Sequence, residues 1–310
     1  MTTHTHRLVR RALVVAATLA IASATVPAAA SAYGWPVKPF DRQHPVRGFF
    51  GDPRIDDADH SGSLHFGVDV VAADGTPVYA TQSGVVSIHP LHETTIIVTG
   101  GGRVFEYWHV VPRVRAGDRV SAYRTVIGRV EAPWAHVHFS ERRGSTYVNP
   151  LRRGAMEPYR DGTIPAAGDV TAERDGVPVP RSQLSGRIDL VGEVHDAMPL
   201  AAPRPWTGKP VMPALVKWRL VATSGRATPW TIAFDVREAL PASPFGTVYA
   251  RWTRQNKPWR SGRYRVFLAR GLDTRTVADG AYRVEVEATD TAGNRGLAAS
   301  TVQIRNGGRR

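Results

Sequence analysis

The stretch Gly62-Ser63-Leu64-His65-Phe66-Gly67-Val68-Asp69-Val70-Val71 lies between a polar loop and an apolar run, and it places an imidazole and a carboxylate four residues apart. Both groups are suited to zinc, and neither requires a thiolate, in a chain that has no cysteine. The flanking residues favour a strand, which would hold the Cα atoms of His65 and Asp69 roughly 13 Å apart, far for two ligands of one ion. We therefore expect the chain to bend at Gly67, because glycine permits a bulge or a tight turn.

Two further stretches carry histidines in strand-like patterns. Ala135-His136-Val137-His138-Phe139 alternates with a period of two, which predicts both histidines on one face of a strand and the intervening apolar residues on the other. One face is expected to be core and the other to face a cleft. Phe105-Glu106-Tyr107-Trp108-His109-Val110 alternates in the same sense, and it predicts that His109 points to the side that Tyr107 occupies.

With these residues in view, the chain resembles the lysostaphin-type (LytM-like) zinc endopeptidases, which cut peptide cross-links in bacterial peptidoglycan. The matching motifs are H-x-x-x-D at His65 and Asp69, Y-x-H at Tyr107 and His109, and H-x-H at His136 and His138. The resemblance covers roughly residues 36 to 155. The sequence departs from the family at Val110, Val137 and Ser140, none of which is a metal or proton-transfer position in the family.

The resemblance implies a role for each of five residues. His65, Asp69 and His138 are implied to bind Zn²⁺ and to leave a fourth position for water, as catalytic zinc sites do. His109 and His136 are implied to be catalytic residues beside the metal, in proton transfer or in stabilising the oxyanion. The implied activity is that of a zinc metalloendopeptidase, which hydrolyses a peptide bond with a metal-activated water.

Other interpretations of the same residues lead to different functions. A catalytically silent relative, which binds the wall and regulates another cell-wall hydrolase, remains an alternative, although such relatives usually lack a metal or base residue. A biotinyl or lipoyl carrier module is excluded because no lysine lies between Lys38 and Lys209. Five further histidines have no matching context and are predicted to be surface or loop residues: His44, His60, His89, His92 and His195. Asp56, Asp57 and Asp59 are predicted to form a polar loop rather than a calcium site.

The first 32 residues predict a signal peptide. Arginines precede the apolar run 12–22, and Ala30-Ser31-Ala32 fits a cleavage site. No later stretch approaches the roughly 20 apolar residues of a membrane span. We therefore expect a secreted or cell-wall-associated protein without a transmembrane segment.

Residues 33–160 are predicted to form one all-β peptidase domain of the LytM type. Its expected strands are 85–88, 95–99, 103–107 and 125–130, with a hairpin at Gly100-Gly101-Gly102. Residues 161–183 are predicted to be a linker, since Pro, Gly and Ala are frequent there. Residues 184–310 are predicted to form an immunoglobulin-like β-sandwich. Its seven expected strands are 187–194, 215–222, 230–236, 247–252, 264–269, 281–288 and 298–304.

Charge is spread unevenly along the chain. The formal net charge is +13, and residues 161–310 hold 22 basic and 14 acidic residues, a balance of +8. A solvated surface explains such a balance, and so does an anionic partner. In an exported protein that partner would be a wall polymer or the membrane surface, and nucleic acid is not expected. The resemblance itself implies that peptidoglycan stem peptides and cross-bridges are the substrate.

Overall fold

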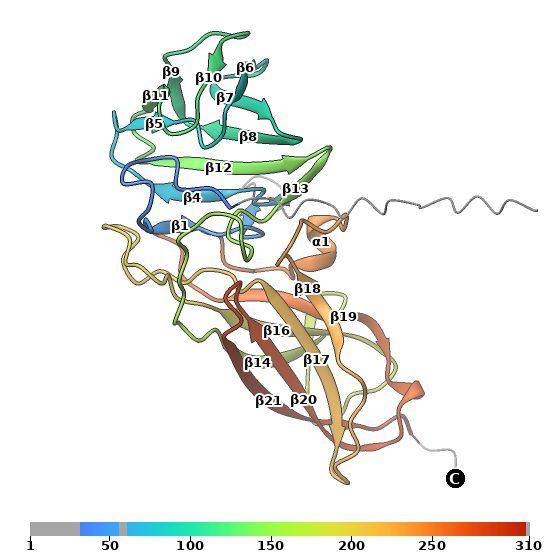
Figure 1. Cartoon of the computed structure of the whole chain (residues 1–310). Helices are drawn as coiled ribbons and strands as arrows, with labels where there is room; N and C mark the ends of the chain where they lie inside the picture. Colours follow the sequence, from blue (N-terminus) through green and yellow to red (C-terminus); the bar gives the residue numbers. More distant parts are fainter. Residues whose placement is uncertain (1–31, 56–60, 308–310) are drawn as a thin grey trace, which may run out of the picture. The chain divides into compact units, whose positions relative to one another are not determined.

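The computed structural model describes residues 32–55 and 61–307 (Figure 1). The predicted all-β class is confirmed, since the described elements are strands apart from the short helix α1 (Phe245–Val248) and the 3-10 turn Thr274–Thr276. The predicted signal peptide, except for Ala32, lies outside the described residues, and so do His60 and the polar loop predicted at Asp56, Asp57 and Asp59. No helix within the described ranges is both long and apolar enough to cross a membrane.

One large antiparallel sheet dominates the chain before residue 150. Its strand order is β1-β4-β12-β8-β7-β6-β10, and β13 pairs with β12. On β12, Val137 and Phe139 enter the core, where Phe139 stacks on Phe105 with ring centroids 5.3 Å apart. The strands are β1 (Val46–Gly48), β4 (Val68–Val71), β6 (Gly84–His89), β7 (His92–Gly100), β8 (Arg103–Trp108), β10 (Arg119–Val120), β12 (His136–Arg143) and β13 (Thr146–Val148).

The predicted strands and hairpin of this part are present. β6, β7, β8 and β11 (Val126–Val130) lie where the sequence favours strands. Gly101 and Gly102 connect β7 to β8 with φ values of 55° and 74°. Two successive residues in the left-handed region are typical of the two-residue type I′ turn, which matches the twist of a hairpin.

Two smaller sheets accompany the large one. The first has the strand order β5-β11-β9, with β5 (Pro77–Tyr79) and β9 (Val110–Pro112), and the second is the hairpin of β2 (Pro53–Ile55) and β3 (Gly62–Leu64). The segment before β1 packs into the same core. Tyr33 OH donates a hydrogen bond of 2.8 Å to Glu141 Oε2, and the fully buried Trp35 donates from Nε1 to Pro158 O at 3.0 Å.

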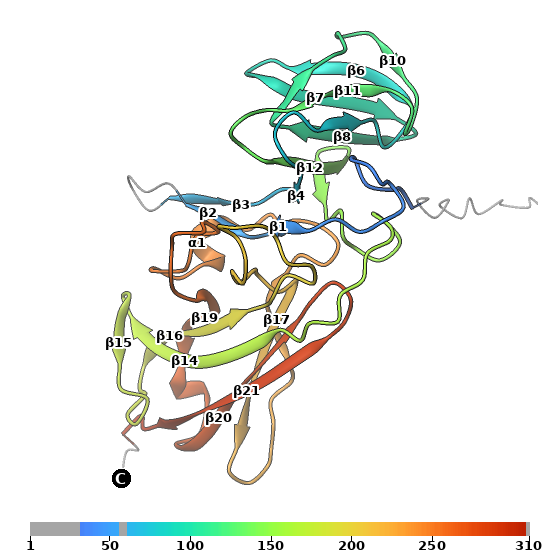
Figure 2. The same ribbon diagram turned by 90° about the vertical axis from the view of Figure 1, so that its left-hand side faces the viewer.

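The described strands after residue 160 form two antiparallel four-stranded sheets (Figure 2). Their orders are β15-β14-β16-β19 and β18-β17-β20-β21, and residues of both sheets belong to one hydrophobic core. The immunoglobulin-like character and the boundary at residue 184 stay predictions. The strands are β14 (Ala166–Arg174), β15 (Val177–Val179), β16 (Arg187–His195), β17 (Leu215–Ala222), β18 (Thr231–Asp235), β19 (Tyr264–Asp273), β20 (Gly280–Thr289) and β21 (Arg295–Ile304).

Two expectations for this part need correction. Within residues 161–183, predicted as linker, β14 and β15 form, and β14 pairs with β16 and buries Val170 and Ala172. Few β-branched residues mark this strand, so its sequence signal is weak. Residues 247–252, predicted as a strand, instead contain the end of α1 and end at Trp252, whose φ of 66° cannot continue a strand.

Candidate metal centre

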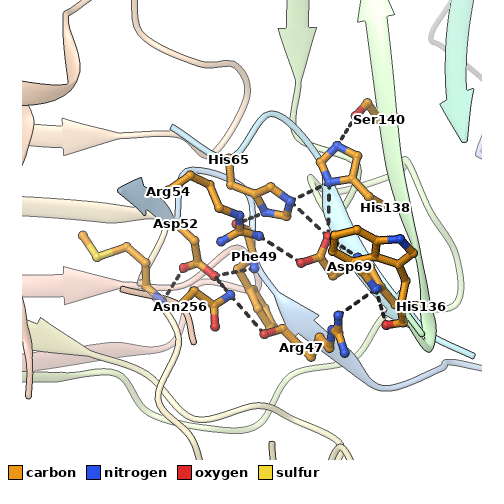
Figure 3. A network of polar contacts seen from close by, with 12 residues as sticks. Arg47, Phe49, Asp52, Arg54, His65, Asp69, His136, His138, Ser140 and Asn256 are labelled. Atoms are coloured by element: carbon orange, nitrogen blue, oxygen red, sulfur yellow. Dashed lines mark hydrogen bonds and ion pairs between the residues drawn. The ribbon is translucent and has the colours of Figure 1, made fainter. Parts of the chain in front are cut away.

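The side chains of His65, Asp69 and His138 converge at one point beside the large sheet (Figure 3). His65 Nε2 lies 2.7 Å from His138 Nδ1, and Asp69 Oδ1 lies 3.1 Å from each of these nitrogens. Donor atoms that share a tetrahedral zinc ion at 2.0–2.1 Å are about 3.3 Å apart. The three atoms therefore form a triangle of the size that a single ion requires, and all three residues are buried.

Strand register and one bend bring the three side chains together. Asp69 and His138 are direct partners in the ladder between β4 and β12, so their side chains lie on the same face. His65 precedes β4 in the connection from β3, and the chain bends at Gly67 as predicted. A Cβ on Gly67 would lie 2.5 Å from Phe139 O and 2.8 Å from His138 Nε2. Glycine is therefore needed here because β12 approaches so closely.

Each of the three side chains has a second partner that fixes its orientation. His65 Nδ1 donates to Phe49 O at 2.8 Å, which leaves Nε2 with its lone pair toward the centre. His138 Nε2 lies 3.0 Å from Ser140 Oγ, so the opposite ring nitrogen, Nδ1, faces the ligand atoms of His65 and Asp69. Arg54 Nη2 donates to Asp69 Oδ2 at 2.9 Å. Such outer partners select the tautomer and hold the ligand atoms in place.

The charge states of the three groups suit a metal ion. Burial lowers the pKa of His65 and lowers that of His138 to about 4. Burial opposes ionisation of Asp69, but His65, His136 and Arg54 hold the pKa of this carboxyl well below its usual range. Metal ligands have to be deprotonated. At neutral pH the centre thus offers two neutral imidazoles and a carboxylate, a donor set that fits zinc.

His136 lies next to this triangle. Its Nε2 is 3.5 Å from Asp69 Oδ1, and its Nδ1 is 2.7 Å from both Arg47 Nη2 and Trp134 O. These two neighbours require different tautomers, because a guanidinium donates and a carbonyl accepts. With Arg47 donating, Nε2 carries the ring proton, whereas with Trp134 O accepting, Nε2 keeps its lone pair. The nitrogen that faces the triangle is therefore able to donate or to accept a proton.

His109 reaches the same place in a way that the sequence pattern did not predict. β8 ends at Trp108, and the backbone of His109 has a φ of 61°, in the left-handed region. Tyr107 points into the core and is fully buried, so the prediction that both side chains share one side is wrong. The His109 ring stacks on Trp134 with centroids 4.0 Å apart and lies 4.8 Å from the His136 ring. Burial, followed by the charge of His136, lowers the pKa of His109 to about 3.

The sequence did not indicate that three residues of this neighbourhood belong to the site: Arg47, Arg54 and Trp134. The two arginines lie before the first metal motif and are two among 36 in the chain, so residue type alone does not single them out. Trp134 stands two residues before His136. This closeness to the H-x-H motif is the one feature of the sequence that could have indicated a site residue. The carbonyl of Trp134 contacts His136, and its ring contacts His109.

Aromatic side chains pack next to His138. Phe66 lies with its ring 4.6 Å from that of His138, and Trp108 packs 5.5 Å from Phe66. His89 and His92, at the tip of the β6–β7 hairpin, lie 5.1 Å and 5.0 Å from the Trp108 ring. These two histidines are at the surface, as predicted, yet they extend the aromatic wall that begins at the metal centre.

Comparison with known proteins agrees with this geometry. Residues 63–150 match the model of Peptidase family M23. Over 101 residues the chain is 32% identical to an uncharacterised protein of Mycobacterium tuberculosis and to one of Mycobacterium bovis. These matches cover 30% of this chain and 25% of each relative, so the chain spans about a quarter of the relatives' length.

Two solved structures are also similar. The catalytic domain of the prophage-encoded M23 protein EnpA from Enterococcus faecalis is 24% identical, with a TM-score of 0.28 over 36% of this chain and 95% of that one. Csd3 from Helicobacter pylori is 22% identical, with a TM-score of 0.29 over 38% of this chain and 33% of that one. Since the residues matched by the family model include His65, Asp69 and His138, residues 63–150 form a segment of peptidase family M23, the family of LytM-like peptidases.

Proposed function

We propose that the chain is an exported, zinc-dependent endopeptidase that hydrolyses peptide cross-links of bacterial peptidoglycan. The observation that carries this proposal is the set of three buried donor atoms 2.7–3.1 Å apart with two further histidines beside them. His65, Asp69 and His138 would hold the ion. When bound, zinc lowers the pKa of a water molecule to about 7 and polarises the scissile carbonyl.

The other residues supply proton transfer and exclude water. His136 Nε2 faces the triangle and is able to take a proton from the attacking water or to give one to the oxyanion or the leaving amine. His109 is neutral at pH 7 and adds a second hydrogen-bonding ring next to it. Trp134 stacks on the His109 ring and excludes water from that face of the ring, which lowers the local dielectric constant and strengthens these interactions.

The positive charge of residues 161–310 suggests a way to hold the enzyme on its substrate. We propose that this part binds anionic wall polymers, because it carries a balance of +8. Binding of this kind weakens with salt, since the Debye length falls from about 10 Å at 0.1 M to about 3 Å at 1 M. Retention on isolated walls is therefore expected at low salt and loss of retention at high salt.

The proposed activity is tested by digestion of purified sacculi with the full-length protein, with and without a chelator, followed by mass analysis of the released muropeptides. New uncross-linked peptides are expected, and they should disappear with the chelator and return with added zinc. Asp69→Ala is the matched inactive variant. If the zinc-loaded protein binds walls and releases nothing, the proposed activity is wrong and a silent regulatory relative remains.

A further inference from the structure

The loop 49–52 binds His65 through three hydrogen bonds. Phe49 O accepts from His65 Nδ1 at 2.8 Å, the Gly51 amide donates to His65 O at 2.8 Å, and the His65 amide donates to Asp52 O at 2.9 Å. Asp69 and His138 are fixed by their strands, whereas His65 lies in a connection. The position of His65 therefore depends on this loop.

Asp52 holds the loop, and two of its partners come from the distant C-terminal part of the chain (Figure 3). The carboxylate is fully buried. Its Oδ2 accepts from the Phe49 amide and from Asn256 Nδ2, both at 2.7 Å, and its Oδ1 accepts from the Met212 amide at 3.0 Å. Two of these three amide donors belong to the C-terminal part. A buried, ionised carboxylate that lost them would be left with unsatisfied acceptor atoms, which is costly.

Asn256 is oriented by two acceptors at once. Its Nδ2 donates to Asp52 Oδ2 and also to Arg47 O at 3.1 Å, so the amide nitrogen and not the oxygen has to face this loop. The residue is buried. Tyr249 adds a third C-terminal contact, because its hydroxyl donates to Gly51 O at 2.7 Å.

A separate contact from the C-terminal part leads to His136. The Arg47 guanidinium lies 4.7 Å from the ring centre of Trp206 and is the group whose Nη2 lies 2.7 Å from His136 Nδ1. An aromatic face attracts a cation and restricts where it lies. Trp206 therefore limits the positions from which Arg47 is able to reach His136.

We infer that the C-terminal part is a working component of the peptidase site, in which Asn256 positions His65 through Asp52 and Trp206 positions His136 through Arg47. The inference rests on the proposed function. Residues Ser31–Arg310 form one compact unit, which agrees with a part that is packed onto the site rather than tethered to it. Both positioning residues lie outside the segment 63–150 that the family model matches.

The first test is Asn256→Ala in the full-length protein, with zinc affinity measured by competition with a chelator. We expect zinc to bind 10- to 100-fold more weakly, the usual effect of removing a group that orients a metal ligand. The cobalt-loaded variant should also show an altered visible spectrum. Asn294→Ala is the matched control, because Asn294 Nδ2 likewise donates to a carboxylate and a carbonyl, those of Asp290 at 2.7 Å and Asp161 at 2.9 Å. It should leave zinc affinity unchanged.

The second test is Trp206→Ala, for which we expect a lower kcat with zinc affinity and KM unchanged. Trp206→Phe retains an aromatic face and should restore kcat. Trp230→Ala is the matched control, since Trp230 lies 4.4 Å from the Arg219 guanidinium within the C-terminal sheets. A loss of stability without a role at the site would affect both tryptophan variants alike.

Equal zinc affinities in Asn256→Ala, Asn294→Ala and the wild-type protein would overturn the inference for His65. If Asn256→Ala does not fold, Tyr249→Phe tests the other C-terminal contact of the same loop, because it removes only the hydroxyl that binds Gly51 O. An unchanged zinc affinity would then overturn the role of the C-terminal part in positioning His65. Equal kcat in Trp206→Ala and Trp230→Ala would overturn the inference for His136. The zinc measurement needs no substrate, so a protein that binds zinc but cleaves no peptidoglycan refutes only the proposed function.

Discussion

Replacing Gly67 with alanine tests how far the metal centre depends on the close approach of β12. An alanine Cβ would lie 2.5 Å from Phe139 O, 2.6 Å from Ser140 Oγ and 2.8 Å from His138 Nε2. Ordinary van der Waals contacts begin at 3.4 Å, so the two segments have to separate by about 0.9 Å at the carbonyl. Metal–ligand distances tolerate deviations of only about 0.2 Å. The shift exceeds that tolerance several times over, and it falls on one of the three metal-binding residues.

We expect Gly67→Ala to fold, with an overpacking cost of about 1–3 kcal/mol, and to bind zinc roughly 100-fold more weakly. Thermal unfolding of the metal-free protein reports the first effect, and chelator competition reports the second. Gly162→Ala is the control, because a Cβ at Gly162 would have no atom within 4 Å. A Gly67→Ala protein that binds zinc as tightly as Gly162→Ala would refute the reasoning from the close approach.

Three further outcomes are expected. His136→Ala and His109→Ala should keep zinc, measured by metal analysis, and lose turnover by roughly 10²-fold or more, and loss of zinc from either would mean that it is a ligand. Arg54→Met should weaken zinc binding about 10- to 100-fold in the chelator assay, because the metal-binding carboxylate loses its outer partner, and unchanged affinity would contradict that role. Burial raises the pKa of Asp196 to about 7, above the value of about 3.9 in an unfolded chain, so its contribution to stability is present below about pH 4 and is lost as pH rises through 7. The free energy of unfolding should therefore fall by up to about 4 kcal/mol as pH rises from about 4 through 7. Unfolding measured across this pH range should show that the fall is lost in Asp196→Asn and is retained in Asp169→Asn, which changes an exposed carboxylate.

The sequence predicts best those features that depend on neighbours along the chain. The period of two around His136 and His138 predicts their shared face, because alternation is a local property of any strand. The bend at Gly67 follows from the spacing of two ligands. The glycine run between β7 and β8 predicts a hairpin for the same local reason.

Other features depend on contacts that local patterns do not contain. His109 itself has a left-handed backbone conformation, so the direction of its side chain does not continue the alternation of β8. Few non-glycine residues adopt that conformation. β14 is held by pairing with β16, and its own composition gives little sign of a strand. Asn256 reaches Asp52 across 204 positions of sequence, so no spacing rule predicts this pair.

The three metal-binding side chains differ in how they are held, and this difference predicts where the centre is weakest. Asp69 and His138 are opposite each other on paired strands of the large sheet, where backbone hydrogen bonds on both sides restrict their movement. His65 lies in a connection, and its ring is oriented by a single carbonyl, Phe49 O. Loosening of the C-terminal part acts on that carbonyl through Asp52, and it leaves the strand pair in place. We therefore expect the zinc site to fail first at His65, with a carboxylate and one imidazole still in position.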